Sequence, residues 1–240
     1  MLILGIIIAI IAISALSIKV YLSSKENKAI QIAQEYLNQK YEQEMQYEST
    51  RFSWIDPSLY HVSFSPVSNS EIIFEVIVYP DLTIPEDRWE FGESSRSADN
   101  YYVKYFEYCM GDYLVADVKR LWDYDATVKV LDITYGGVAF CVSPELDDKM
   151  TLAEMEPLIN DYWIYIKTGE MTVDDQSLEE SARRIFEFIQ IIKNNGFMPE
   201  TIDFWYPATE DETTDVVLRN WNKIDTVDQV VALLKAEIGK

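Results

Sequence analysis

The stretch YHVSFSPVSNSEIIFEVIV, residues 60–78, decides the fold of this chain. Apolar and polar side chains alternate over residues 60–64, and the alternation returns over residues 72–78. Successive side chains of a strand point to opposite faces of the sheet, so each run predicts a strand with one buried face. Proline, serine and asparagine over residues 66–70 predict a turn between the strands. The stretch therefore predicts an antiparallel hairpin.

Two polar side chains of this hairpin are candidates for a functional site. Glu75 shares a strand face with Ile73 and Ile77, and this face is apolar enough to be covered by another part of the chain. A covered carboxylate needs a partner or has a raised pKa, as many functional acids do; an exposed glutamate is the alternative. His61 is the single histidine, and alternation points it away from the apolar face. We therefore expect His61 on the solvent side of its strand.

Helical patterns flank the hairpin on both sides. Apolar side chains recur at helical spacing over residues 29–41, and again over the longer segment 98–122. The first domain, residues 23–124, is therefore expected to be α+β, with antiparallel strands and helices packed on one face of the sheet. Residues 23–28 (SSKENK) are expected to form a short polar linker before the first of these helices.

The first eighteen residues, MLILGIIIAIIAISALSI, contain no charged side chain. A helix of about 17 apolar residues is roughly 26 Å long, and its continuation to Leu22 completes a bilayer span. We therefore predict a transmembrane anchor over residues 1–22, with residues 2–22 in the membrane. A cleaved signal peptide and a buried core helix are the alternatives. No Lys or Arg precedes the apolar stretch, and residues 14–17 match a cleavage site poorly.

Two opposed signals bear on the direction of the anchor. Lys19, Lys25 and Lys28 follow the apolar stretch, and the positive-inside rule would place the globular part in the cytoplasm. However, the chain has 41 acidic and 20 basic residues and a net charge of −21. Anionic lipid repels such an acidic domain. We favour a single-pass protein of the cell membrane with an extracytoplasmic globular part.

The second half of the chain, residues 125–240, alternates strand and helix patterns and is expected to form a second α+β domain; an extension of the first sheet is the alternative. Residues 126–134 and 138–142 flank the sequence Tyr-Gly-Gly, which predicts a hairpin. The other expected elements are helices opened by capping boxes at residues 151–154 and 226–229, a helix from Asp174 or Asp175 to Gly196, and strands over residues 162–166 and 202–206.

Composition excludes several classes of protein. An apolar content of 48% is too high for a disordered chain, and the excess of acids leaves no basic stripe for nucleic acid. Cys109 and Cys141 form no C-x-x-C motif; we expect two buried free thiols, with a single disulfide as the alternative. The sequence has no HExxH motif, calcium loop or G-x-S-x-G elbow. We therefore expect no metal, no cofactor and no catalytic residue.

A family resemblance rests on the first helix and the hairpin. Residues 33–41 read AQEYLNQKY, the strand with Tyr60, Val62 and Phe64 follows, and residues 73–76 read IFEV. Over residues 1–122 this pattern resembles the membrane-anchored YfjL-like proteins of Gram-positive bacteria. In such proteins an anchor leads into a helix with a Y-L-x-x-K-Y pattern and a strand with F-E-V. The resemblance implies an extracytoplasmic location and brings no catalytic residue.

A second candidate surface lies near the C-terminus. The sequence FWYP, which contains Trp205 and Tyr206, leads into an acidic run with Glu210, Asp211 and Glu212. Alternation points Trp205 away from its neighbours in the strand. An exposed tryptophan beside acids would suit a sugar, a peptide or a cationic group. Core packing of the tryptophan and a solvated acidic loop are the alternatives.

Together these features predict a binding or interaction module at the cell surface, with an unknown protein, peptide or wall polymer as partner. Its candidate binding residues are Glu75, Trp205, Tyr206, Glu210, Asp211 and Glu212. A carboxylate-based envelope hydrolase acting on glycans and an accessory subunit of a membrane complex are the alternatives. A buried or paired Glu75 in a concave pocket would favour the hydrolase, and an aromatic patch near Trp205 would favour the binding module.

Overall fold

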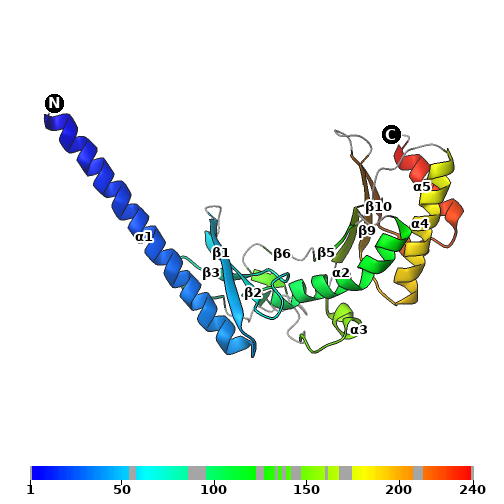
Figure 1. The fold of residues 1–240 in the computed structure, drawn as a ribbon, viewed down its shortest axis with the longest axis horizontal. Coiled ribbons are helices and arrows are strands. Elements are labelled where there is room, and N and C mark those ends of the chain that lie inside the picture. The colour runs from blue at the N-terminus through cyan, green and yellow to red at the C-terminus, as the bar shows by residue number, and fades with distance from the viewer. Residues whose placement is uncertain are drawn as a thin grey trace. The chain divides into compact units, whose positions relative to one another are not determined.

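A computed structural model of the chain, drawn in Figure 1, shows an α+β protein with antiparallel and mixed sheets. The described residues are 2–53, 58–85, 96–122, 127–132, 135–136, 139–141, 147–159, 162–167, 175–207 and 213–238; for residues 2–20 and some residues at the ends of the other ranges, only the secondary structure is described. The chain divides into two compact units, residues 1–101 with 136–141 and residues 102–135 with 142–240. Each unit is described by itself below.

One long helix, α1 (Leu2–Lys40), begins the first unit (Figure 1). The polar linker expected over residues 23–28 is wrong, because these residues are helical. Ser, Lys, Glu and Asn lower helix propensity only moderately, and no Gly or Pro lies between residues 6 and 40 to interrupt the helix. Among the described side chains, no helix is both apolar and long enough for a bilayer crossing. The side chains of residues 1–20 lie outside that set, so the anchor over residues 1–22 stays a prediction.

The predicted hairpin is confirmed as part of a three-stranded antiparallel sheet in the first unit. β1 (Met45–Ser53), β2 (Leu59–Pro66) and β3 (Phe74–Val78) follow one another in the sheet, with Tyr60 opposite Val78 and Phe64 opposite Phe74. Strand β1 was not predicted, since its sequence MQYESTRFS has little apolar alternation. Buried side chains from α1 and from the apolar faces of β2 and β3 pack together in this unit; they include Ala29, Ala33, Leu37, Tyr60, Val62, Phe64, Phe74, Val76 and Val78.

A second, small sheet has the order β4-β7-β6, formed by β4 (Arg96–Ser97), β6 (Tyr135–Gly136) and β7 (Ala139–Cys141). The hairpin expected between residues 126–134 and 138–142 is therefore wrong in its pairing. β5 (Thr127–Asp132) pairs with β8 (Tyr162–Lys167), with Val130 opposite Ile164. The Tyr-Gly-Gly signal predicts only a local turn. The backbone hydrogen bonds of β5 are made instead with β8, a strand that lies about 30 residues later in the chain.

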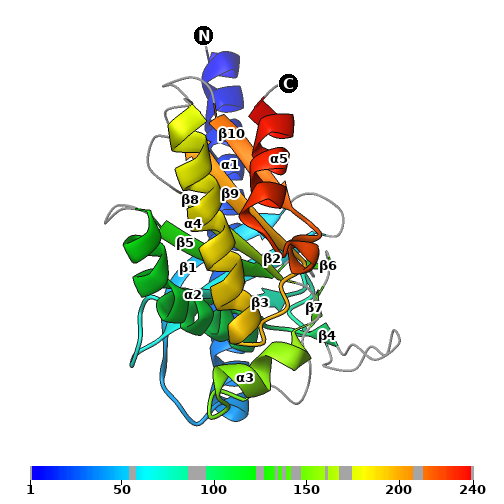
Figure 2. The same cartoon turned by 90° about the vertical axis from the view of Figure 1, so that its right-hand side faces the viewer.

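The second unit is built on a four-stranded mixed sheet in the order β10-β9-β8-β5. β9 (Thr201–Pro207) pairs parallel with β8, and β10 (Thr213–Leu218) pairs antiparallel with β9. The parallel pair is joined through α4 (Asp175–Asn194), as a parallel connection requires. Figures 1 and 2 show α4 and α5 (Val227–Ile238) on the same face of this sheet. The second unit is therefore α+β, with these two helices on one face of its sheet.

Helix α2 (Tyr101–Leu121) agrees with the predicted segment and belongs almost entirely to the second unit. Its aromatic side chains pack there: the ring centroid of Phe106 lies 5.2 Å from that of Tyr162, and Tyr113 lies 5.5 Å from Phe197. The sequence placed a boundary near residue 124, after this helix. The apolar stripe of α2 marked a buried face but did not indicate which sheet would bury it.

The predicted helix ends of the second unit are confirmed. Thr151 and Glu154 form a capping box at α3 (Leu152–Met155), which continues as the 3-10 helix η1 (Glu156–Leu158). At α5 the amide of Thr226 donates to Gln229 Oε1 over 3.1 Å. Gly196 follows α4 with a φ of 76°, the left-handed conformation that glycine adopts without a Cβ penalty.

Candidate functional site

The polar residues of the Y-L-x-x-K-Y pattern converge on one buried carboxylate of the first unit. Tyr41 Oη donates to Asp99 Oδ1 over 2.7 Å, and Tyr36 Oη donates to Asp99 Oδ2 over 2.8 Å. Lys40 Nζ lies 2.9 Å from the same Oδ2, and the backbone amide of Tyr101 donates to Oδ1 over 3.0 Å. Tyr36 and Lys40 are four residues apart and lie on one side of α1, and Tyr41 follows directly after the helix end.

This cluster is a structural lock for α1. Asp99 is only 2% exposed, so its charge is removed from water and depends on Lys40 and on the donated hydrogen bonds. The carboxylate also lies at the start of α2, where the free amides of a helix favour negative charge. Both carboxylate oxygens accept hydrogen bonds inside the protein, so the cluster fixes α1 against the loop before α2 and does not present a reactive group.

The two candidates of the hairpin lie within hydrogen-bond distance of each other on the other face of the β1–β3 sheet. His61 Nδ1 lies 3.0 Å from Glu75 Oε2, and the Arg51 guanidinium lies 3.8 Å from Oε1. His61 is 3% exposed, so the expectation that it faces solvent is wrong. The polar face of β2 is covered as well as the apolar one, since Ser65 is also buried. Glu75 is paired with His61 and its side chain is 31% exposed, so its role as a binding residue stays a prediction.

The second candidate surface is only partly described. Trp205 is half-buried on β9, and Lys167 Nζ lies 4.4 Å from the centroid of its ring, in cation–π contact. Asp215 is the cross-strand partner of Trp205 in the β9–β10 register. The side chain of Tyr206 and the residues Glu210, Asp211 and Glu212 lie outside the described part of the chain. Trp205 therefore has a cationic partner within the protein.

The hydroxyl of Tyr162 and the thiol of Cys109, both in the second unit, have raised pKa values. Burial, with the nearby Glu156 carboxylate as the next cause, raises the pKa of Tyr162 far above its ordinary value; the tyrosine hydroxyl donates to Glu156 over 3.0 Å. Burial also raises the pKa of the Cys109 thiol, which is free and half-buried.

Cys141 is described only as part of β7. Within the described residues no cluster of three or more His, Cys, Asp or Glu could hold a metal ion.

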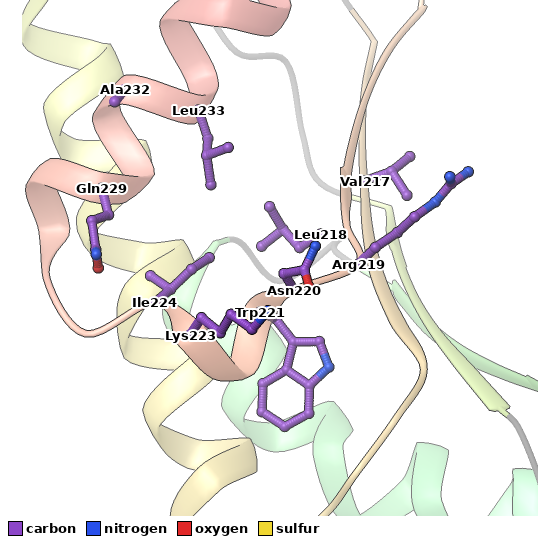
Figure 3. Close-up of a pocket in the computed structure, with 10 residues that line it drawn as sticks. All are labelled: Val217, Leu218, Arg219, Asn220, Trp221, Lys223, Ile224, Gln229, Ala232 and Leu233. Carbon is purple, nitrogen blue, oxygen red and sulfur yellow. The ribbon is translucent and has the colours of Figure 1, made fainter.

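A pocket of about 680 Å³ lies between the end of β10, the 3-10 helix η2 (Trp221–Lys223) and α5. This volume is in the range of small-molecule sites. Figure 3 shows Leu218 of β10 and Leu233 of α5 pointing into the space between these elements, with Asn220 and Ile224 beside them. The lining residues are Val217, Leu218, Arg219, Asn220, Trp221, Lys223, Ile224, Gln229, Ala232 and Leu233.

The pocket lies beside a buried tryptophan and includes apolar side chains that reach solvent. The buried Trp221 donates its indole N–H to the carbonyl of Pro199 over 2.7 Å, which fixes the ring. Leu233 is exposed, as is Val217, although both are apolar. Exposed apolar side chains that line a concave surface are typical of ligand sites. The arrangement can hold an apolar group of a ligand and has no described nucleophile or acid–base pair.

Sequence reasoning missed this pocket, because its signal is short. Residues 219–224 read RNWNKI, a tryptophan between two cations in a strongly acidic chain. The strand β10 before it was not predicted, so nothing placed these residues opposite α5. Comparison of the chain with protein-family models, curated proteins and solved structures finds no match.

Proposed function

We propose that the protein is a membrane-anchored binding module that presents an acidic α+β domain outside the cytoplasm. The uncharged sequence of residues 1–18 supports the anchor, and the net charge of −21 supports the outer location. The module binds its ligand through the β10–α5 pocket of the second unit.

The observation that carries this proposal is the pocket itself, with its exposed apolar walls. Folding leaves Leu233 40% exposed to water, although burial of such a side chain typically gains about 1.5–3 kcal/mol. A bound apolar group would recover part of this free energy. Trp221 of η2 is buried and its indole is hydrogen-bonded to the Pro199 carbonyl, so the η2 side of the pocket is packed before a ligand enters.

The test is ligand binding to the full chain in detergent micelles, followed by NMR of isotope-labelled Leu, Val and Ile methyl groups. Hexanamide is a suitable neutral probe, because it combines a short apolar chain with one polar group. We expect its addition to shift the methyl signals of Val217, Leu218, Ile224 and Leu233 selectively.

A matched pair of variants locates the binding. Ala232 is exposed and lines the pocket, so Ala232→Trp fills the cavity without replacing a core residue. Ala236 is exposed one turn further along α5 and is not among the lining residues, so Ala236→Trp is the control. Hexanamide shifts should vanish in Ala232→Trp and persist in Ala236→Trp. Absence of the shifts, or their survival in Ala232→Trp, would overturn the proposal.

A further inference from the structure

We infer that the β10–α5 pocket selects small amphipathic anions, in which one negative group such as a carboxylate is joined to an apolar chain. This inference rests on the proposed function and names the ligand class for the same pocket. It follows from the contrast between the charge of the lining and the charge of the whole chain.

The lining is positive in a protein that is otherwise acidic. Arg219 and Lys223 are the charged residues among the lining, and the lining contains no Asp or Glu, although the chain has 41 acidic and 20 basic residues. No described carboxylate forms an ion pair with either cation. The acid next to η2, Asp225, is bound instead by Lys193 over 3.1 Å. The charges of Arg219 and Lys223 are therefore left for a ligand.

The positions of the polar and apolar groups fit a ligand with two different ends. Figure 3 shows Leu218 and Leu233 inside the pocket, while Arg219 extends past β10, away from α5. The apolar chain of a ligand would lie between the leucines. Its charged end would lie toward η2 and the rim, near Lys223 and the side chain of Asn220, which can donate a hydrogen bond.

The general field of the protein does not prevent this selection. The net charge of −21 repels anions at long range, but at physiological ionic strength such fields are screened within about 8 Å. Lys223 is the lining cation on η2, whereas Arg219 extends away from α5, so Lys223 is the charge that favours a negative group at this end of the pocket. A cationic ligand would be repelled there.

The test compares hexanoate with hexanamide, which differ only in the charged group, on the full chain with the same methyl signals as readout. We expect hexanoate to bind about fivefold more tightly, as two charges about 4 Å apart in water predict. The preference should disappear in the double variant Arg219→Gln/Lys223→Gln, whereas hexanamide binding should stay unchanged. Lys235→Gln removes an exposed cation of α5 outside the pocket and is the control; it should keep the preference.

The outcomes separate this inference from the proposed function. If hexanamide binds at the pocket and hexanoate binds no more tightly, the ligand class is wrong and the binding module stands. If the preference survives the double variant, the lining cations do not cause it and the inference is also overturned. If neither compound binds, the proposed function fails as well.

A further experiment with N-acetyl-leucyl-leucine distinguishes two sources of the anion. Tighter binding than that of hexanoate would indicate the carboxyl end of a peptide, and weaker binding would indicate a fatty acid.

Discussion

The hydroxyl of Tyr41 donates a 2.7 Å hydrogen bond to the buried carboxylate of Asp99, a residue 58 positions later in the chain. Tyr36 and Lys40, in the last two turns of α1, bind the same carboxylate. The polar part of the Y-L-x-x-K-Y pattern thus has a structural reason: it supplies the donors that allow Asp99 to be buried. The apolar part, Leu37, packs into the core beside it.

Replacing Asp99 tests this lock. Asp99→Asn keeps the shape of the side chain but removes the carboxylate charge that lies 2.9 Å from Lys40 Nζ. Removing one member of a buried pair costs about 3–5 kcal/mol, and we expect about 3 here because Lys40 keeps 27% of its side chain exposed. Hydrogen exchange of amides 29–40 should report this loss of opening free energy. Glu179→Gln removes one member of an exposed pair on α4 and should leave exchange unchanged; equal effects of the two variants would refute the lock.

The capping box of α3 predicts a pH dependence. The Thr151 amide and hydroxyl both donate to Glu154 and lower the pKa of its carboxyl. A lowered folded pKa means that the contribution to stability is present above the unfolded value of about 4.3 and is lost as the pH falls through the folded value. Thr151→Ala removes the hydroxyl alone, so the pKa of Glu154 should rise partway toward its ordinary value in a carboxyl NMR titration. No rise would mean that the hydroxyl has no part in the shift.

The thiol of Cys109 should react slowly. Burial raises its pKa, and the thiolate is the form that reacts. In a full-length Cys141→Ser variant, we expect iodoacetamide to alkylate Cys109 more slowly than free cysteine at pH 8. The rate of alkylation should still rise with pH above pH 9. Guanidinium chloride should bring the rate to that of free cysteine. A rate that levels off below pH 8.5 would contradict the raised pKa.

The outer location of the globular part can be tested by labelling. Ser70 is exposed in the turn before β3, so Ser70→Cys, with Cys109 and Cys141 replaced by serine, offers one thiol to reagents. We expect a membrane-impermeant maleimide to label this variant on intact cells, while a cytoplasmic marker protein is labelled only after lysis. Labelling of the variant only after lysis would place the globular part in the cytoplasm.

Local signals in the sequence predicted local structure well. The hairpin at residues 60–78, the helix caps at Thr151 and Thr226, and the left-handed Gly196 each depend on neighbours within a few residues, and all are confirmed. Features that depend on distant partners were not predictable. His61 is buried because its second strand face is also covered, and β5 finds its partner in β8, far along the chain.

The pocket was unpredictable for the same reason. Its walls come from β10, η2 and α5, and only a tertiary arrangement turns Leu218 and Leu233 toward one space (Figure 3). Composition did predict an acidic protein. In such a chain, a pocket lining with the cations Arg219 and Lys223 and no Asp or Glu is unexpected and indicates the charge of the ligand that we infer. The acidic run with Glu210, Asp211 and Glu212, although prominent in the sequence, lies outside the described residues, so its role as a binding surface stays a prediction.

The most direct test of the central claim is a search for intermolecular nuclear Overhauser effects between hexanoate and the full chain. The account predicts effects from the hexanoate methylene protons to the methyl groups of Leu218 and Leu233, and their loss in Ala232→Trp. Two results would contradict a binding site between β10 and α5: effects found only at methyl groups of residues 1–22, or no effect at any methyl group of the second unit.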